Sequence, residues 1–160
     1  MSLPACFVDI DAPEGAQAVP IHVVDRASWN DWRAQQVQTT LAWLDGNGFA
    51  PSPGSWLVIP GADGRPRCVV AAIGDANDPY ALSHLPVLLP PGVYRIAGDS
   101  LIKPADGLLQ LGWGLGAYRF DRYVKPPRAP ARLACATRDA LAQSLLDAVV
   151  LVRDLVNTPT

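Results

Sequence analysis

The amino-acid sequence predicts an α/β domain with a mixed β-sheet. Short runs that alternate apolar and polar residues, as strands do, are interleaved with segments whose apolar residues recur every three or four positions, as in helices. The chain has 160 residues and 49% of them are hydrophobic, which is enough for one compact core. No repeat of about 20 to 50 residues is visible, so solenoids and propellers are excluded.

Five strands are predicted from alternation and from the frequency of β-branched and aromatic residues. They cover residues 6–10, 21–24, 56–59, 68–73 and 93–97. The third and fourth strands flank a stretch rich in Pro, Gly and Asp at 60–66. This turn chemistry predicts that these two strands pair antiparallel.

Two helices are predicted between the second and the fifth of these strands. Ser28 and Asp31 place a hydroxyl and a carboxylate three residues apart, where each can accept a hydrogen bond from a free amide of a helix first turn. The helix that follows is expected to end near the Gly-Asn-Gly sequence at 46–48. Asp78, with a proline directly after it, predicts that a short helix begins there and that Pro86 ends it.

Two further helices are predicted, at 104–117 and 137–156. The first contains the run G-W-G-L-G at 112–116, which lacks the G-x-G-x-x-G spacing of a dinucleotide loop and indicates close helix packing. The second has apolar residues on more than one face. The side expected to pack on this domain comprises Leu141, Leu145, Ala148 and Val152. The side expected to remain exposed comprises Leu146, Val150, Leu151 and Leu155.

No motif of a nucleophilic, phosphate-binding or zinc-protease site is present. The two histidines, His22 and His84, have no second histidine or carboxylate at ligand spacing, so both are interpreted as structural side chains. We therefore assign this chain no catalytic residue, no metal ligand and no cofactor. The three cysteines form no C-x-x-C pair, and the sequence shows no signal-peptide pattern. Its one long apolar stretch contains charged residues. These observations predict a cytoplasmic protein without a membrane partner.

The charge balance argues against nucleic acid as a partner, because 13 basic and 15 acidic residues give a net charge of −2. Two alternatives remain open. Basic residues interleaved with aromatics at 118–128 would form an accessory nucleic-acid surface, unless the aromatics pack inward. The loop at 74–78, after a predicted strand, would hold a nucleotide or ADP-ribose in a free-standing macro-like module, unless its aspartates only cap the next helix.

Two stretches near the C-terminus resemble peptidase family M17, the leucyl (cytosol) aminopeptidases. Residues 116–123 read G-A-Y-R-F-D-R-Y and resemble the G-x-Y-x-F-x-x-Y segment that closes the N-terminal domain of that family. Residues 152–159 read V-R-D-L-V-N-T-P and are similar to the R-D-L-x-N-x-P signature of its interdomain helix. The order of the two motifs, and their separation by one long helix, also match.

This resemblance implies a three-layer, macro-domain-like sandwich at 1–130 and an interdomain linker helix at 131–160. The C-terminal catalytic domain, absent from this chain, would be the partner. The parent protein would be a metal-dependent leucyl aminopeptidase, a hydrolase that uses two divalent ions, zinc or manganese, to remove N-terminal residues from peptides. This non-catalytic domain would shape a hexamer and access to its active sites. The residues expected to contact the catalytic domain are Leu151, Arg153, Asp154, Leu155, Asn157 and Pro159.

Overall fold

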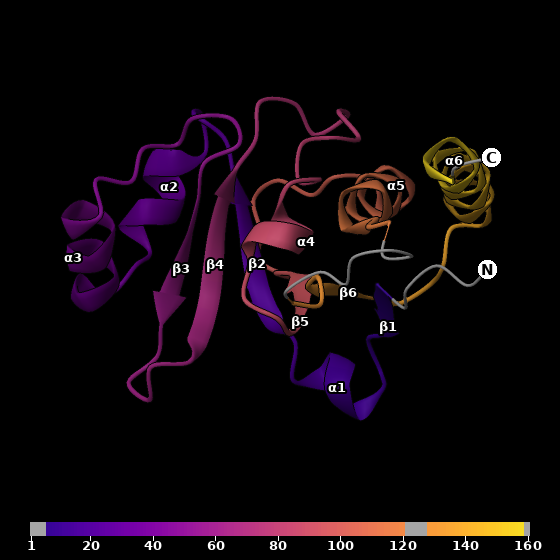
Figure 1. Ribbon diagram of the computed structural model, residues 1–160. Helices are drawn as coiled ribbons and strands as arrows, with labels where there is room; N and C mark the ends of the chain where they lie inside the picture. The colour runs from indigo at the N-terminus through magenta and orange to yellow at the C-terminus, as the bar shows by residue number, and fades with distance from the viewer. Residues whose placement is uncertain (1–5, 121–127, 159–160) are drawn as a thin grey trace.

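Strands and helices alternate along the chain in the computed structural model, which describes residues 6–120 and 128–158 (Figure 1). The elements of these residues are β1 (Phe7–Asp9), α1 (Pro13–Ala16), β2 (Val19–Val24), α2 (Trp29–Ala34), α3 (Gln38–Gly46), β3 (Trp56–Pro60), β4 (Pro66–Ala72), α4 (Leu85–Leu88), β5 (Val93–Ile96), α5 (Asp106–Ala117), β6 (Arg132–Cys135) and α6 (Ala140–Asn157). The predicted α/β class is confirmed.

The strands form one mixed sheet in the order β1-β6-β5-β2-β4-β3. Neighbouring strands are parallel except for β3 and β4, which pair antiparallel as the turn between them predicted. The sequence analysis missed β6, because its residues R-L-A-C include no β-branched or aromatic side chain. Tertiary pairing decides its position, since β1 binds one edge of β6 and β5 binds the other.

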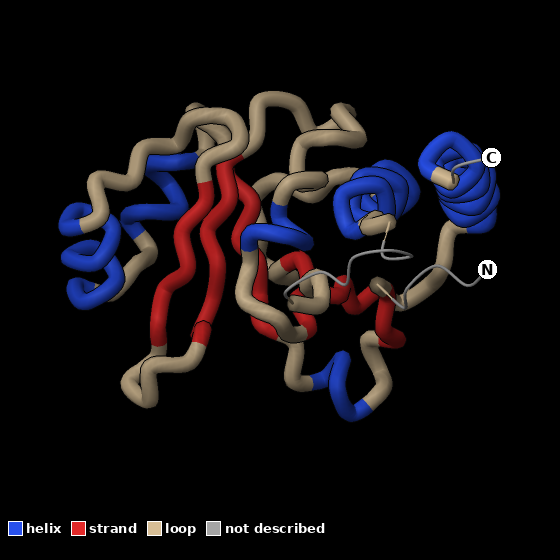
Figure 2. The backbone as a smooth tube through the Cα atoms, in the orientation of Figure 1, coloured by secondary structure: helices blue, strands red, loops and turns tan. Residues whose placement is uncertain are grey.

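Helices cover both faces of the sheet, which gives the expected three layers (Figures 1 and 2). On one face, Trp32 of α2 and Leu44 of α3 belong to an apolar cluster with side chains of β2, β3 and β4. On the other face, Leu85 of α4, Trp113 of α5 and Leu146 of α6 belong to a second cluster. The sheet therefore divides the core into two halves, each closed by its own helices.

The single helix predicted from Ser28 onward is two helices, α2 and α3, because the backbone between them leaves the helical conformation. The capping box also lies three residues earlier than predicted. Asp25 Oδ1 accepts from the Ser28 N–H at 2.7 Å, and Ser28 Oγ accepts from the Asp25 N–H at 3.0 Å. Asp31 is not the capping partner. The end of α3 is as predicted, at Gly46, with Gly48 at φ +61°.

The helix predicted to begin after Asp78 is wrong, because residues 79–84 form turns and α4 begins only at Leu85. The local capping contact is nevertheless present, since Asp78 Oδ1 accepts from the Tyr80 N–H at 2.9 Å. Pro86 lies in the first turn of α4 and does not end a helix. Proline is tolerated there because the N–H groups in the first turn of a helix have no acceptor within the helix.

Close packing explains the glycines of α5, as predicted. A Cβ placed on Gly112 would come within 1.7 Å of the Pro79 carbonyl oxygen, and a Cβ on Gly116 would come within 1.7 Å of the Ser83 carbonyl oxygen. Both neighbours are backbone atoms, which cannot rotate away as a side chain can. The G-x-G-x-G run therefore lets the turns before α4 lie directly on α5.

The prediction of which side of α6 is buried is wrong in part. Leu151 and Leu155 are exposed as expected, but the buried side is formed by Ala142, Leu146 and Val150. The residues that were expected to pack inward, Leu141, Leu145, Ala148 and Val152, are exposed. The reason lies on α5, where Gly114 has no side chain and Leu146 occupies the space that its Cβ would need, 2.6 Å away. Both stripes of α6 have helical periodicity, so only the partner helix selects between them.

Candidate functional site

The two motifs at the C-terminus meet in space although they are 36 positions apart. Tyr118, just after α5, donates a hydrogen bond from Oη to Asp154 Oδ1 of α6 at 2.6 Å. The guanidinium carbon of Arg153 lies 5.3 Å from the centroid of the Tyr118 ring, and Arg153 Nη1 donates to the Leu115 carbonyl oxygen at 3.3 Å. The C-terminal half of α6 is thus attached to the end of α5 through one tyrosine.

The Tyr118 hydroxyl is kept protonated by its surroundings. Partial burial and the hydrogen bond to Asp154 raise the pKa of Tyr118 above its ordinary value of 10.0. The phenol therefore remains a donor to the carboxylate in more alkaline solution than a tyrosine with the ordinary pKa would. Thr158 Oγ1 donates to the Asp154 carbonyl oxygen at 2.7 Å, which satisfies a free carbonyl at the end of α6.

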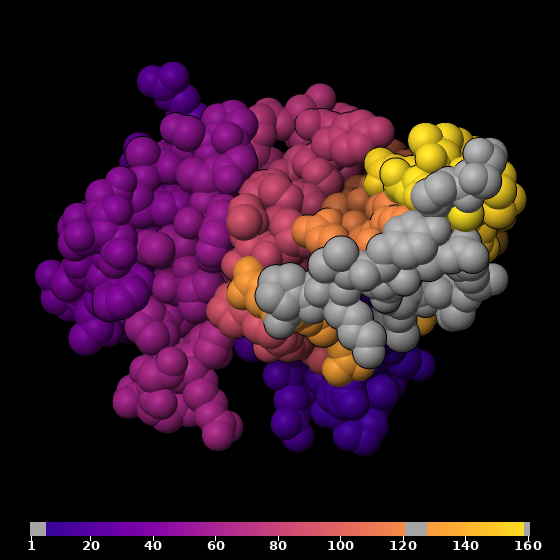
Figure 3. All heavy atoms as spheres, viewed as in Figure 1, coloured from indigo at the N-terminus to yellow at the C-terminus, as the bar shows by residue number. Residues whose placement is uncertain are grey.

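The side of α6 that faces away from α5 is a band of large exposed apolar side chains. Their exposed fractions range from 44% for Leu145 to 79% for Val156. The members of this band are Leu141, Leu145, Leu151, Val152, Leu155 and Val156. Figure 3 shows α6 in yellow at the end of the molecule opposite to the purple region of α3. Bands of exposed apolar side chains are common at sites where another protein surface binds.

The six residues expected to contact a catalytic domain divide into two groups. Leu151 and Leu155 belong to the exposed band, and Asn157 is also exposed. Arg153 and Asp154 instead contact Tyr118 and hold α6 against α5. Pro159 lies outside the described residues. The sequence analysis gave Tyr118 no role of its own, although its place in the first motif was the signal that could have found it.

The basic and aromatic stretch at 118–128 binds backbone atoms where it is described. Arg119 Nη1 donates to the Tyr118 carbonyl oxygen at 2.7 Å, and Arg128 Nη2 donates to the Leu88 carbonyl oxygen at 3.1 Å. Both carbonyls lie at helix C-terminal ends, where a cation also interacts favourably with the helix dipole. Arg122 and Lys125 lie outside the described residues. These contacts favour the packing interpretation over a nucleic-acid surface.

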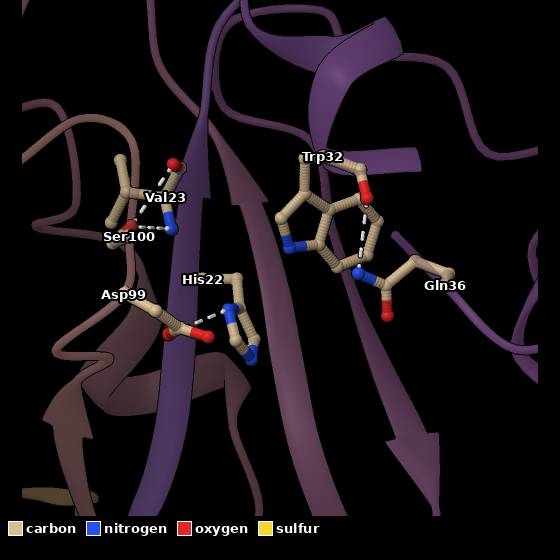
Figure 4. A network of polar contacts seen from close by, with 6 residues as sticks. All are labelled: His22, Val23, Trp32, Gln36, Asp99 and Ser100. Carbon is tan, nitrogen blue, oxygen red and sulfur yellow. Dashed lines mark hydrogen bonds and ion pairs between the residues drawn. The ribbon is translucent and has the colours of Figure 1, made fainter. Parts of the chain in front are cut away.

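His22 lies on β2 between the Asp99 carboxylate and the Trp32 indole (Figure 4). Its Nδ1 is 3.6 Å from Asp99 Oδ1 and has no hydrogen-bond partner among the described residues. Burial is the main cause that lowers the pKa of His22, and Asp99 opposes it. Beside it, Ser100 Oγ accepts from the Val23 N–H at 2.8 Å and extends the β5 side of the ladder on β2. This arrangement supports a structural role for His22.

Metal-binding and reactive groups do not gather in the described part of the chain. Among residues 6–120 and 128–158, no three His, Cys, Asp or Glu side chains lie close enough to hold a metal ion. Cys6 and Cys68 are buried, and burial raises the pKa of Cys6 to about 11, which leaves an unreactive thiol. Within the same residues, no helix combines the length and the apolar character needed to cross a membrane.

Comparison with known proteins gives one family match and several similar structures. The family model for the N-terminal domain of M17 aminopeptidases matches residues 19–136. The cytosol aminopeptidase from Coxiella burnetii is similar in structure, with 26% sequence identity and a TM-score of 0.80, over 98% of this chain and 34% of that chain. Among curated proteins, nothing matches.

Two structures of the bottromycin maturation enzyme BotP are also similar, each at 27% identity. The first, in complex with Mn, has a TM-score of 0.59 over 88% of this chain and 32% of that chain. The second has a TM-score of 0.57 over 89% of this chain and 33% of that chain. This chain therefore spans about a third of the length of the solved structures that it matches.

Proposed function

Since this chain belongs to the family of M17 aminopeptidase N-terminal domains, we propose that it is the non-catalytic part of a metal-dependent leucyl aminopeptidase that removes N-terminal residues from peptides. The similarity to a cytosol aminopeptidase over 98% of this chain supports the proposal. The length relation supports it too, because this chain corresponds to only 34% of that structure, which leaves ample length for a separate catalytic domain.

We place the metal ions of the parent enzyme, two zinc or two manganese ions, in that catalytic domain. Such a pair activates a water molecule and polarises the scissile carbonyl. One of the similar structures is described in complex with Mn. The described residues of this chain do not fit a metal pair, because no three potential ligands converge in them. We therefore assign them no step of the hydrolysis.

The exposed apolar band of α6 is the observation that best supports a contact between this domain and the catalytic domain. We propose that the catalytic domain covers this band, with Leu151 and Leu155 at the contact, and that Asn157 contributes from the side of α6 that meets Tyr118. Arg153 and Asp154 contribute indirectly, because their contacts with Tyr118 fix the direction in which α6 leaves the sheet. Pro159, which lies outside the described residues, is retained in the proposed contact because it belongs to the second motif.

The wider assembly follows from the same proposal. We infer a homo-oligomer, a hexamer in the parent, in which this domain shapes access to the active sites, and a cytoplasmic location. The similarity to a cytosol aminopeptidase supports the location, and the exposed apolar band of α6 supports association with a further protein surface. The division at 130 and 131 stays a prediction. Because β6 pairs within the sheet, α6 is the part of 131–160 that would link the domains.

The test compares two single substitutions of leucine by glutamate in the parent enzyme. Leu155→Glu is expected to lower hydrolysis of leucine p-nitroanilide, because a buried leucine contributes about 1.5 to 3 kcal/mol to a contact. Leu101→Glu is the matched control, since Leu101 is 50% exposed and lies outside α6. Equal activities of the two variants would remove the support for the domain contact.

The non-catalytic role has its own test on this chain alone. Purified residues 1–160 are expected to give no turnover of leucine p-nitroanilide with zinc or manganese added, because the described residues hold no ligand cluster. Turnover that requires the metal and stops with a chelator would contradict the proposal. The parent enzyme, measured in parallel, is the positive control.

A further inference from the structure

Two neighbouring parallel strands, β2 and β4, are followed by connections on opposite faces of the sheet. The chain leaves β2 toward α2 on one face of the sheet and leaves β4 toward α4 on the other face (Figure 1). In open α/β sheets, connections that separate in this way open a crevice at the carboxyl ends of the strands, and ligands bind in such crevices.

A cavity of about 710 Å³ lies at this point. Asp25, Arg26 and Ala27, which follow β2, form one side, and Ile73 and Gly74, which follow β4, form another. The loop at 50–53 closes the third side. Binding sites for small molecules have volumes of about 300 to 1,000 Å³, so the cavity has the size of a ligand site.

The wall formed by the loop at 50–53 is held in place by backbone hydrogen bonds. The Gly54 N–H donates to the Ala72 carbonyl oxygen at 2.9 Å, and the Ala72 N–H donates to the Ser55 carbonyl oxygen at 2.8 Å. Gly74 allows the close approach, because a Cβ there would lie 3.3 Å from a side-chain carbon of Pro53. These contacts join the end of the loop to β4 and to the residues that follow it.

Two residues of opposite charge that are adjacent in the sequence, Asp25 and Arg26, line the cavity. Asp25 Oδ1 accepts from the N–H and from the Oγ of Ser28, both at 2.7 Å, and these hydrogen bonds lower the pKa of the carboxyl. The carboxylate therefore stays ionised and has lone pairs for a further donor. The guanidinium of Arg26 is exposed and forms no ion pair with any carboxylate of the described residues.

The rest of the lining is largely apolar, with Pro51, Pro53 and Ile73. We propose that this cavity binds a small zwitterion of the α-amino acid class. Its ammonium would contact Asp25, its carboxylate would contact Arg26, and an apolar side chain would lie against the prolines. A phosphate-bearing ligand fits less well, because Asp25 would repel it beside the single guanidinium.

The experiment is a titration of the 160-residue chain with L-leucine, followed by NMR. Leucine is expected to shift the backbone amide signals of residues 25–27, 73 and 74 in a saturable way. Leucinamide lacks the carboxylate and 4-methylpentanoate lacks the ammonium, so each is expected to bind about tenfold more weakly, the effect of one lost charge-assisted hydrogen bond.

Arg26→Gln is the diagnostic variant. It is expected to weaken leucine about tenfold and to leave leucinamide unchanged, because only the carboxylate contact is removed. Arg65→Gln is the matched control, an exposed arginine in the turn between β3 and β4 that does not line the cavity. It is expected to bind leucine as the unaltered chain does.

Three results would overturn this inference. They are no saturable shift with leucine at millimolar concentration, equal effects of Arg26→Gln and Arg65→Gln, and binding of AMP in preference to leucine, which would identify a nucleotide site instead. The aminopeptidase proposal depends on the family match and on the exposed band of α6, and not on this cavity. Failure of one proposal therefore leaves the other standing.

Discussion

Tyr118 and Asp154 share a hydrogen bond of 2.6 Å that joins the end of α5 to the last turns of α6. Arg153 lies over the same tyrosine ring, so both charged residues of the second motif contact one residue of the first. The consequence is that α6 has one side fixed to the domain along its length while its apolar band stays free for another surface.

Tyr118→Phe is expected to destabilise the chain by about 1 kcal/mol, the typical loss of one hydrogen bond. The stability losses of Asp154→Asn and Tyr118→Phe are expected not to add in the double variant, because both substitutions remove the same contact. Chemical denaturation of the two single variants and the double variant measures this coupling. Tyr80→Phe is the control and should be neutral, since Tyr80 is 61% exposed.

The Tyr118 contact is also expected to make stability fall in alkaline solution. Because the folded-state pKa of Tyr118 is raised, its contribution is complete below the unfolded pKa of about 10 and is lost as pH rises through the folded value. The free energy of unfolding should therefore fall more steeply above pH 10 in the unaltered chain than in Tyr118→Phe. The pKa of buried Tyr94 is raised as well, so the difference between the two chains is the quantity that counts.

Acid is expected to destabilise the fold through the two histidines. Burial lowers the pKa of both His22 and His84, so their neutral forms stabilise the folded state above the unfolded pKa of about 6.5. This stability is lost as pH falls below 6.5 toward the folded values. In the double variant His22→Gln, His84→Gln, the free energy of unfolding, measured by chemical denaturation, should depend less on pH in that range. An unchanged slope would show that other groups titrate there.

Gly112→Ala is expected to destabilise by about 1 to 3 kcal/mol or more, because the added methyl meets the Pro79 backbone at 1.7 Å. Gly46→Ala in α3 is the matched control, since nothing lies within 4 Å of its Cβ position. It should be neutral or stabilising by up to about 1 kcal/mol through helix propensity. Thermal unfolding of both variants measures the contrast.

The isolated chain is expected to self-associate through the apolar band of α6 as concentration rises. Leu151→Glu should weaken this association without unfolding the chain, because Leu151 is 60% exposed. Light scattering over a range of concentrations measures the mass, and Leu101→Glu should associate as the unaltered chain does. A strict monomer at high concentration, with Leu151 protected from solvent, would show that α6 is buried in another way.

Local patterns in the sequence were sufficient where the deciding contacts are local. Turn residues at 60–66 predicted the antiparallel pairing of β3 with β4, and the glycines at 112–116 predicted close packing on α5. The position of the capping box was missed by three residues, because the Ser28 side chain pairs with Asp25, before the helix, and not with the first turn of α2.

The α/β class, most strands and helices, and the two motifs that indicate the family could be predicted from local patterns, because periodicity and turn chemistry depend on neighbouring residues. The position of β6, the buried side of α6 and the hydrogen bond between Tyr118 and Asp154 instead depend on contacts between distant segments. For α6 this is so because the helix carries two apolar stripes with the same helical spacing. Only the groove at Gly114, on another helix, selects the stripe that contains Leu146.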